Sequence, residues 1–439
     1  MTEHLRDSGL VRVVGPWGLA ASTINMIVGA GIFLVPAQLA ASIGTYAPLA
    51  FIACAIAIGA VAICFAEGGS RIPTSGGAYG YIAAAFGPLV GYIAGTILWF
   101  SDALACGGLA AAFADITVSL LPPPTRAAAH AAVIVSIIGG IAWVNVGGVQ
   151  RGTRLASAVT LLKLIPLVVF VVAGFGAVRG AHYLSTVEPK TADLGRALIL
   201  ALFAYTGMEV SLSASGEVAH PARTIPRALA IAIPAVALLY VVVQIVAQGI
   251  LGPALANSSA PLADAMAQIN PALRALMLVG AALSILGAIS SDLLGTPRML
   301  FAFARDGLLP RFLGRVHPRS RAPYLAIMCY AALAVGMALT STFAELAVLS
   351  ALGSAALFLV GCAAAWRLAR SGVARAGAPL DFRYLGAAAL TGIASMTCVI
   401  ALAARKEIIG LAGVIAASAL LYLASARSAR STWSNPEST

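Results

Sequence analysis

Residues 24–36 read Ile24-Asn25-Met26-Ile27-Val28-Gly29-Ala30-Gly31-Ile32-Phe33-Leu34-Val35-Pro36, in the middle of the first long apolar segment. Two glycines interrupt this segment, and a proline follows about one helical turn later. We therefore predict a helix that is broken at membrane depth. Broken backbone in hydrocarbon is tolerated only where it lines a cavity or binds something. The break thus predicts one half of a substrate site.

Composition places the chain in the membrane. Its 439 residues are 60% hydrophobic and 10% charged, with a mean hydropathy of +0.95, which a soluble core of this size could not hide from water. The six cysteines all fall in apolar stretches without metal-ligand spacing, so we expect buried thiols, no metal and no cofactor. We expect the first apolar segment to be retained, because it lacks a signal-peptide cleavage site.

Twelve apolar segments each approach the roughly 20 residues that cross a bilayer. They lie near residues 14–42, 46–68, 86–120, 127–147, 155–178, 194–216, 227–250, 273–303, 323–341, 345–366, 384–404 and 408–425. The sequence therefore predicts an all-α polytopic membrane protein with 12 transmembrane helices in a single domain, residues 1–439.

Basic residues set the expected orientation. If the N-terminus is cytoplasmic, nineteen of the 27 lysines and arginines lie on the inner side, seven lie outside, and Lys163 falls within a membrane segment. This bias fits the positive-inside rule with both termini cytoplasmic. The net charge of +11 is then explained by topology, and no nucleic acid partner is expected.

A second interruption lies in the sixth segment, which reads Ala204-Tyr205-Thr206-Gly207-Met208-Glu209. A glycine and a carboxylate in mid-membrane predict another broken helix. Two broken helices five segments apart indicate two five-helix repeats of opposite orientation, about 14–178 and 194–366, with a site between them. The segments in 384–425 would be accessory helices.

Four ordered motifs resemble the amino acid/polyamine/organocation family of permeases. They are Gly29-Ala30-Gly31-Ile32-Phe33, the stretch from Phe65 to Tyr79, the stretch from Glu217 to Arg227, and Arg305-Asp306-Gly307-Leu308-Leu309-Pro310. The resemblance implies a leucine-transporter-like 5+5 inverted repeat with two further C-terminal helices. It also implies alternating access around a midplane site, in a monomer or homodimer of the cell inner membrane.

The implied activity is sodium-independent secondary transport of amino acids, by proton coupling or exchange. The alternative is a polyamine or cationic amino acid antiporter. The small-molecule substrate and the lipid bilayer are the expected partners, and protons are possible ones.

The broken helices suit a zwitterion, because N–H groups at a half-helix start hold a carboxylate and freed carbonyls hold an ammonium. We assign the carboxylate to Val28, Gly29, Ala30 and Gly31. We assign the amino group to Ile27 and the backbone of Phe203, Ala204 and Tyr205, beside the break at Gly207. Phe203 matches an aromatic that covers the occupied site in similar permeases. Alternatively, the glycines only allow close helix packing.

Ionisable residues inside the membrane need a partner or water. Lys163 matches a fifth-helix lysine that stands where sodium-coupled relatives bind their ion. It either carries a proton during transport or is pinned to carbonyls of the first segment. Glu209 either titrates during transport or serves as a permanent acceptor that holds the broken sixth helix.

Asp102 and Asp292 depart from the pattern of the arginine/agmatine antiporter of this family, which has uncharged residues near these positions. Either they receive a cationic side chain or diamine, or one of them neutralises Lys163. Ser290 and Ser291 are expected beside Lys163.

Other functional classes find little support in the sequence. It contains no phosphate-binding Gly-Lys-Ser/Thr loop and no paired-histidine metal motif, so we expect neither an ATP-driven pump nor an enzyme. A channel would not explain paired broken helices as well. A transporter-like sensor is a further alternative, and it would bind its ligand without transporting it across the membrane.

Overall fold

We describe the fold from a computed structural model of the chain. The described residues are 15–29, 31–72, 78–118, 121–147, 163–183, 190–209, 221–305, 307–320, 322–374 and 379–433. Over these ranges the chain forms helices and turns, without a strand. The prediction of an all-α protein is confirmed for this part of the chain.

The helices follow the apolar segments closely. The first part of the chain forms α1 (Pro16–Ile27), α2 (Gly31–Ile43), α3 (Ala47–Arg71), α4 (Ala78–Phe86), α5 (Pro88–Val118), α6 (Arg126–Val146), α8 (Leu164–Phe175) and α9 (Thr191–Tyr205). The second part forms α11 (Pro221–Leu251), α12 (Pro261–Ala267), α13 (Pro271–Gly295), α14 (Pro297–Arg305), α15 (Tyr324–Thr340), α16 (Phe343–Arg370), α17 (Leu385–Ala401) and α18 (Arg405–Trp433). Short 3-10 turns are η1 (Gly44–Tyr46), η2 (Pro123–Thr125), η3 (Gly180–Tyr183), η5 (Gly252–Asn257) and η6 (Arg311–Gly314).

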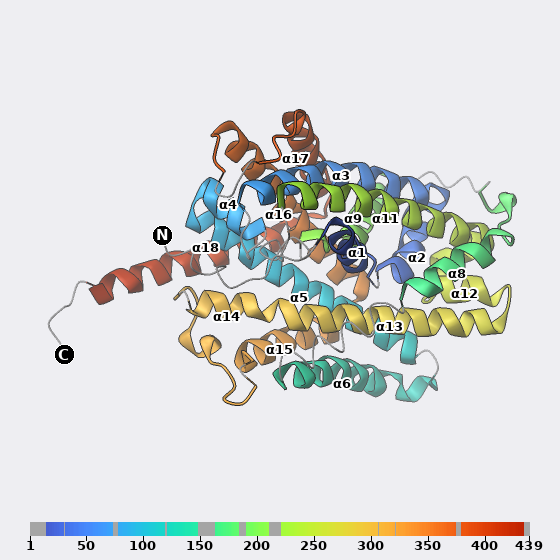
Figure 1. The fold of residues 1–439 in the computed structure, drawn as a ribbon. Coiled ribbons are helices and arrows are strands. Elements are labelled where there is room, and N and C mark those ends of the chain that lie inside the picture. Colours follow the sequence, from blue (N-terminus) through green and yellow to red (C-terminus); the bar gives the residue numbers. More distant parts are fainter. Residues whose placement is uncertain are drawn as a thin grey trace. The chain divides into compact units, whose positions relative to one another are not determined.

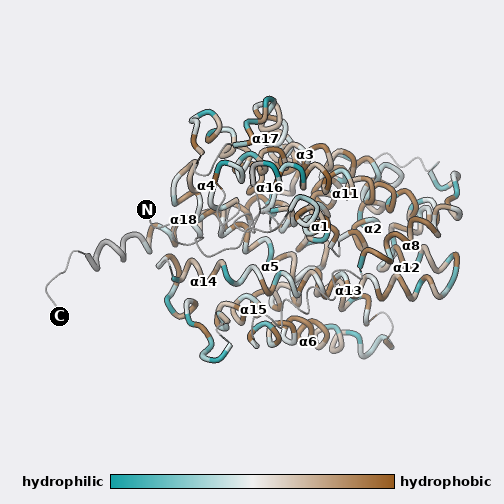
Figure 2. Tube along the Cα trace, in the orientation of Figure 1, coloured by the Kyte–Doolittle hydropathy of each residue, from teal (hydrophilic) through white to brown (hydrophobic). Residues whose placement is uncertain are grey.

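Hydropathy supports a multi-pass membrane protein. Within the described ranges, seven helical stretches are long and apolar enough to cross a membrane, and one of them, Gly31–Arg71, spans two of the predicted segments. Figure 2 shows hydrophobic residues along the helices and hydrophilic ones concentrated in connections, such as that between α14 and α15. Large apolar side chains stay exposed where lipid would contact them, including Val172 and Phe175 on α8, at 74% and 71%. The count of twelve crossings stays a prediction.

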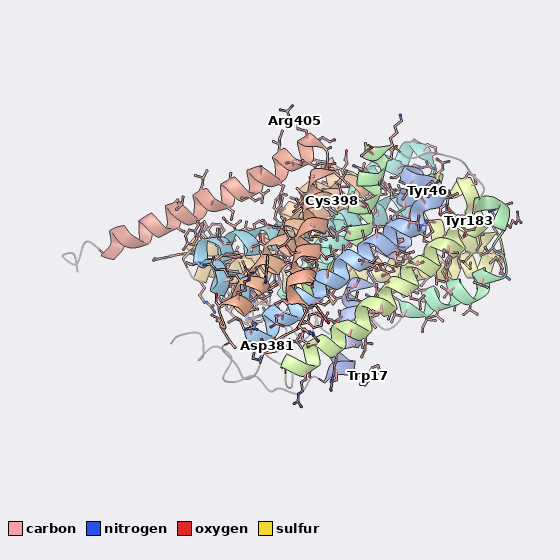
Figure 3. The ribbon with its side chains drawn as sticks, turned by 90° about the horizontal axis from the view of Figure 1, so that it is seen from above. Trp17, Tyr46, Tyr183, Asp381, Cys398 and Arg405 are labelled. Atoms are coloured by element: carbon pink, nitrogen blue, oxygen red, sulfur yellow. The ribbon has the colours of Figure 1, made fainter. Side chains whose placement is uncertain are left out.

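Two compact units make up the chain, and each draws on both predicted repeats. The first contains residues 1–94, 164–281 and 354–404. In it α3 and α11 run side by side, α1 packs on α11, α2 and α3 pack on α9, and α17 lies along α3 (Figure 1). Trp17 and Asp381 lie at one end of this unit, whereas Tyr46 and Tyr183 lie at the other (Figure 3).

The second unit contains residues 95–163, 282–353 and 405–439. Its best-defined packing is that of α15 against α6 and α14, which Figure 1 shows as neighbouring helices. Glycine at position 107 of α5 permits a close approach to α15, because a Cβ there would lie 2.9 Å from the Ala334 carbonyl oxygen.

A buried charge pair closes one end of α3 in the first unit. The Arg71 guanidinium donates from Nε to Glu67 Oε1 at 2.7 Å, and the two side chains are 4% and 0% exposed. Its other nitrogens donate to the carbonyl of Val373, at 3.2 Å, and to the carboxylate of Asp381. One arginine thereby binds its own helix and the connection between α16 and α17.

The same connection makes two further bonds to the end of α3. The backbone N–H of Phe382 donates to Glu67 Oε2 at 3.0 Å, and that of Leu380 donates to Ser70 Oγ at 3.1 Å. Because both Glu67 oxygens are occupied, the buried carboxylate is well compensated. Nothing in the sequence predicted that this loop docks on α3.

Candidate functional site

The first helix is broken at the predicted glycines. α1 ends at Ile27, Val28 has φ −72° and ψ 71°, and α2 begins at Gly31. The Val28 N–H still bonds the Ile24 carbonyl at 2.7 Å, and the Gly29 N–H turns back to the Ile27 carbonyl at 2.7 Å. The first N–H groups of α2, which start a new helix, have no earlier turn to donate to. Ala30, assigned to the same site, lies outside the described residues.

Packing alone does not require glycine at either position. A Cβ at Gly31 would make ordinary contact, 3.4 Å from the Ala204 Cα, and one at Gly29 would meet nothing closer than 3.8 Å. The alternative in which these glycines serve only close helix packing is therefore weakened. The Phe203 ring lies against this break, since its Cδ1 would be 3.7 Å from the same Cβ at Gly31.

The sixth predicted segment is broken as well. α9 ends at Tyr205, Thr206 is extended with ψ 156°, and Gly207 has φ +113°. The Phe203 carbonyl at this end accepts from the Thr206 hydroxyl at 2.7 Å and from the Thr206 N–H at 3.2 Å. Residues 210–220 are outside the described part, so the continuation of this helix is not characterised.

Glycine is required at position 207 for two independent reasons. Its φ lies in the region that L side chains rarely adopt. A Cβ there would also lie 2.9 Å from the Met26 carbonyl oxygen, closer than real Cβ atoms come. The two breaks therefore meet at Gly207, with backbone of one against backbone of the other.

Glu209 belongs to this junction. Its side chain is buried, and Oε2 accepts the Gly207 N–H at 3.0 Å. The carboxylate thus bonds the turn that breaks the helix. This contact is the one expected if Glu209 is a permanent hydrogen-bond acceptor. A titrating role for Glu209 stays a prediction.

Tyr240 on α11 joins the two breaks, and the sequence analysis missed it. Its fully buried hydroxyl lies 2.8 Å from the Ile27 carbonyl oxygen and 2.9 Å from that of Ala204. Each carbonyl is at the C-terminal end of a half helix, where the helix dipole is negative. The only sequence signal was a tyrosine in an otherwise apolar segment, with Gln244 and Gln248 one and two turns further on the same face.

In the second unit, Asp102 and Asp292 are brought together by a residue that was not predicted. The Thr296 hydroxyl lies 3.0 Å from Asp102 Oδ2 and 2.9 Å from Asp292 Oδ1. Tyr330 donates its hydroxyl to Asp292 Oδ2 at 2.6 Å. Hydroxyl groups of the protein therefore contact both oxygens of Asp292.

A hydrogen count constrains this pair. Threonine has one hydroxyl hydrogen, so Thr296 can donate to only one carboxylate at a time. Both of its contacts are hydrogen bonds only if the other carboxyl group carries a proton and donates to Oγ1. The arrangement is thus complete when Asp102 and Asp292 together hold one proton.

The remaining predicted residues are also in the second unit. Lys163 is 4% exposed and directly precedes α8. Ser290 is fully buried and its hydroxyl has no partner in the described part of the chain, whereas Ser291 is half-buried. Their expected proximity to Lys163 stays a prediction. Among the described residues, no group of three or more His, Cys, Asp or Glu could hold a metal ion.

The comparison with known families decides the class. Residues 14–404 match the family described as amino acid permease. The chain belongs to the amino acid permease family. This permease is therefore a multi-pass membrane transporter and not an enzyme, as the motifs predicted.

Curated relatives agree with this family. An uncharacterised transporter of Mycobacterium tuberculosis is 33% identical over 332 residues, which cover 72% of the permease and 71% of the relative. A methylthioribose transporter of Bacillus subtilis is 28% identical, covering 82% of each chain. A branched-chain amino acid permease of the same organism is 24% identical, covering 89% of this chain and 88% of the relative.

Proposed function

We propose that this permease is a secondary transporter of amino acids that works by alternating access, without sodium, by proton coupling or exchange. The observation that carries this proposal is the meeting of two helix breaks in one compact unit. Gly207 lies against Met26, and Tyr240 binds the last carbonyls of both half helices. Such a junction offers donors and acceptors that are not used up by helical hydrogen bonds.

The polarity of the junction fits an α-amino acid. The start of α2 presents N–H groups at the positive end of a helix dipole, which favours a carboxylate. The ends of α1 and α9 present carbonyls, which favour an ammonium group. We assign the carboxylate to the backbone around Val28, Gly29 and Gly31, and the ammonium group to that around Ile27 and Ala204. The Gly31 N–H starts the new helix, whereas the N–H groups of Val28 and Gly29 already bond the Ile24 and Ile27 carbonyls and would have to exchange those bonds for the carboxylate. The Ile27 carbonyl already accepts from the Gly29 N–H and faces the Tyr240 hydroxyl, so an ammonium group would replace one of these contacts there.

Helix pairing supports the two inverted repeats. In a two-fold arrangement, if the first helix of one repeat packs on the second helix of the other, the symmetry-related pair must be present as well. The first unit contains both such pairs, α1 with α11 and α9 with α3, together with the self-related pair of α3 and α11. We propose on this basis that residues 14–178 and 194–366 are the two repeats.

We further propose that the permease lies in the cell inner membrane with both termini cytoplasmic. The bias of basic residues supports this orientation. So does the position of Trp17 and Asp381 at one end of the first unit, opposite Tyr46 and Tyr183 (Figure 3). Those two pairs occupy the predicted inner and outer sides, respectively.

Amino acids are favoured over diamines as substrates. A diamine pocket needs carboxylate oxygens that are open to a cation, yet both oxygens of Asp292 contact hydroxyl groups, Oδ1 that of Thr296 and Oδ2 that of Tyr330. We propose that Asp102 and Asp292 are paired internally and share a proton. The relative named for branched-chain amino acids also supports an amino acid substrate.

Replacement of Asp292 by Asn tests the shared proton. An amide can accept from Tyr330 and donate to Thr296, whose hydrogen then bonds Asp102, so Asp292→Asn satisfies the cluster without an added proton. We expect wild-type-like thermal stability together with a flatter dependence of uptake on pH. The matched control is Tyr330→Phe, which should lower stability but keep the pH dependence. If uptake by Asp292→Asn depends on pH as it does in the wild type, Asp102 and Asp292 do not take part in proton coupling.

Lys163 offers a second test of coupling. We expect Lys163→Ala to abolish turnover, because it leaves a buried site without its cation. Lys163→Gln keeps hydrogen-bond donors but cannot carry a proton. If Lys163 is a proton carrier, Lys163→Gln binds substrate but loses pH-dependent transport in proteoliposomes. If Lys163→Gln transports substrate with the full pH dependence of the wild type, Lys163 does not carry the proton and has only a structural role.

Tyr240→Phe tests the bridge between the two breaks. It removes a hydroxyl whose single hydrogen is available to the two carbonyls, and leaving a buried acceptor without its donor costs about 1–3 kcal/mol. We expect a lower unfolding temperature and a several-fold higher KM for substrate exchange. Tyr183→Phe is the control, because its hydroxyl donates to the Ile245 carbonyl, away from the breaks. Equal KM values in the two variants would show that Tyr240 does not position the site.

Ligand-dependent stability is the experiment that tests the substrate class. The purified permease is heated with each of the twenty amino acids and with putrescine, cadaverine and agmatine. A ligand of the folded state at 100 times its Kd adds about 2.7 kcal/mol of stability. We expect neutral amino acids to raise the unfolding temperature. Stabilisation by diamines alone would overturn the proposed substrate class.

A further inference from the structure

Three side chains on one face of α11 contact the backbone of α1, α2 and η1. Tyr240 bonds the Ile27 carbonyl, as described above. One turn later Gln244 Nε2 lies 3.4 Å from the Pro36 carbonyl oxygen, and one turn beyond that Gln248 Nε2 donates to the Gly44 carbonyl at 2.9 Å. We call these three residues the polar seam of α11. All three side chains are at most 3% exposed.

Gln244 is the member of the polar seam with unmet hydrogen bonds. Its nitrogen faces two acceptors, the Pro36 carbonyl and Gln248 Oε1, each at the long distance of 3.4 Å. This fixes the amide orientation, since a flipped amide would set oxygen against oxygen. Gln244 Oε1 then has no partner among the residues that the structure describes, although the residue is fully buried. A buried acceptor without a donor indicates a bound group.

A second acceptor lies next to it along α2. Pro36 is inside this helix and has no N–H, so it cannot donate to the Ile32 carbonyl one turn earlier. Residues 32 and 36 are on the same face of α2, and Pro36 faces α11 through its bond with Gln244. The Ile32 carbonyl therefore lies one helical turn before the Pro36 carbonyl that Gln244 Nε2 approaches.

We propose that one water molecule binds between α2 and α11, donating one hydrogen to Gln244 Oε1 and the other to the Ile32 carbonyl. Two acceptors call for a donor with two hydrogens, and a water in this position supplies one to each. Buried waters occur at polar positions of this kind, with two to four protein partners. They also enter helices where a proline removes a backbone bond.

The water gives α2 a hydrated hinge at Pro36. The bonds of Gln244 are long, and a water bond can be exchanged, so α2 can bend there without leaving polar atoms unpaired. This part of the inference rests on the proposed function, because α2 carries the anion-binding start at Gly31. Bending of α2 at Pro36 would move that start during the transport cycle.

Radiolytic labelling of the purified permease tests the water directly. Hydroxyl radicals formed from a bound water modify the side chains around it even where bulk water is excluded. Ile32 and Pro36 are buried, as is the control residue Phe170 on α8. We expect label on Ile32 and Pro36 in the wild type, none on Phe170, and loss of the label in Gln244→Met. Gln248→Met should keep the label, because the nitrogen and the oxygen of the wild-type Gln248 amide each have a protein partner.

Two labelling results would overturn the inference. Ile32 and Pro36 labelled no more than Phe170 would show that no water is bound. If Ile32 and Pro36 are still labelled in Gln244→Met, the label comes from bulk water that reaches them when the protein opens, and not from a bound water.

The hinge is tested by exchange kinetics in proteoliposomes. Gln244→Met should lower the maximal rate several-fold with little change in KM, since it removes the water and not the site. Loss of label with an unchanged rate would overturn the hinge. If wild-type protein shows the label but no flux of any amino acid, the proposed transport function fails while the water site stands.

Discussion

Gly207→Ala is expected to reduce amino acid exchange roughly 100-fold. The added Cβ would have to adopt a φ of +113° and would lie 2.9 Å from the Met26 carbonyl oxygen. Strained backbone of this kind costs on the order of 1–3 kcal/mol before the clash is counted. If the substitution raises the free energy of the arrangement in which the two breaks meet by about 3 kcal/mol, the population of that arrangement falls about 100-fold. Counterflow of labelled amino acid in proteoliposomes measures this loss.

The control for this variant is Gly59→Ala. Gly59 lies in α3 of the same unit, and a Cβ there would meet nothing within 4 Å. Alanine is the better helix former, so this variant should be as stable as wild type or slightly more stable, with unchanged exchange. Normal exchange by Gly207→Ala, with Gly59→Ala also normal, would show that the close approach of the two breaks does not matter for transport.

Arg71→Ala is expected to lower the stability of the folded permease by about 3–5 kcal/mol. That is the usual cost of breaking a buried ion pair by removing one partner. In this variant the fully buried Glu67 carboxylate loses its bond with Arg71. Of the two bonds described above, it keeps the one from the Phe382 N–H. It also frees the connection between α16 and α17 from the end of α3. Chemical or thermal unfolding in detergent measures the change.

Arg383→Ala is the matched control for charge. Arg383 is exposed, and its guanidinium stacks over the Tyr384 ring at 5.4 Å. Removing it should change stability by less than about 1 kcal/mol. Equal destabilisation by the two variants would indicate a general effect of charge and contradict the structural role of Arg71. Arg71→Lys, which keeps the charge without the planar fork, should fall between wild type and Arg71→Ala.

Local sequence was sufficient to predict most helices and both breaks. The helices of the described part of the chain fall within the predicted apolar segments or next to them, because hydrophobic length decides which stretches can span a membrane, and seven helical stretches there are long enough to do so. Gly29, Gly31 and Gly207 stood out because glycine weakens a helix at a depth where an uninterrupted spanning helix would carry Leu, Val or Ala. The breaks at Val28 and Thr206 followed from them.

Contacts between distant segments could not be predicted in the same way. Tyr240 is 213 residues from Ile27, and Tyr330 is 38 residues from Asp292, so neither bond has a local pattern. Thr296 bridges Asp102 and Asp292 because a turn between α13 and α14 positions it there. A tyrosine or threonine in an apolar segment is only a weak signal, since either can bond its own helix.

The Asp102 and Asp292 pair shows what the structure adds. From sequence, two intramembrane carboxylates suggested a cationic substrate or neutralisation of Lys163. The hydroxyls of Thr296 and Tyr330 add a third possibility, a pair that is satisfied by neutral donors and one shared proton. Side-chain hydrogen counting, which needs coordinates, made that distinction.

The central claim is that two meeting helix breaks form an amino acid transport site, and exchange flux tests it most directly. Purified permease is reconstituted in sodium-free liposomes preloaded with an unlabelled neutral amino acid, and entry of the labelled form is followed. The account predicts saturable counterflow by the wild type and its near-complete loss in Gly207→Ala. Absence of counterflow for every amino acid in a correctly folded wild-type preparation would contradict it.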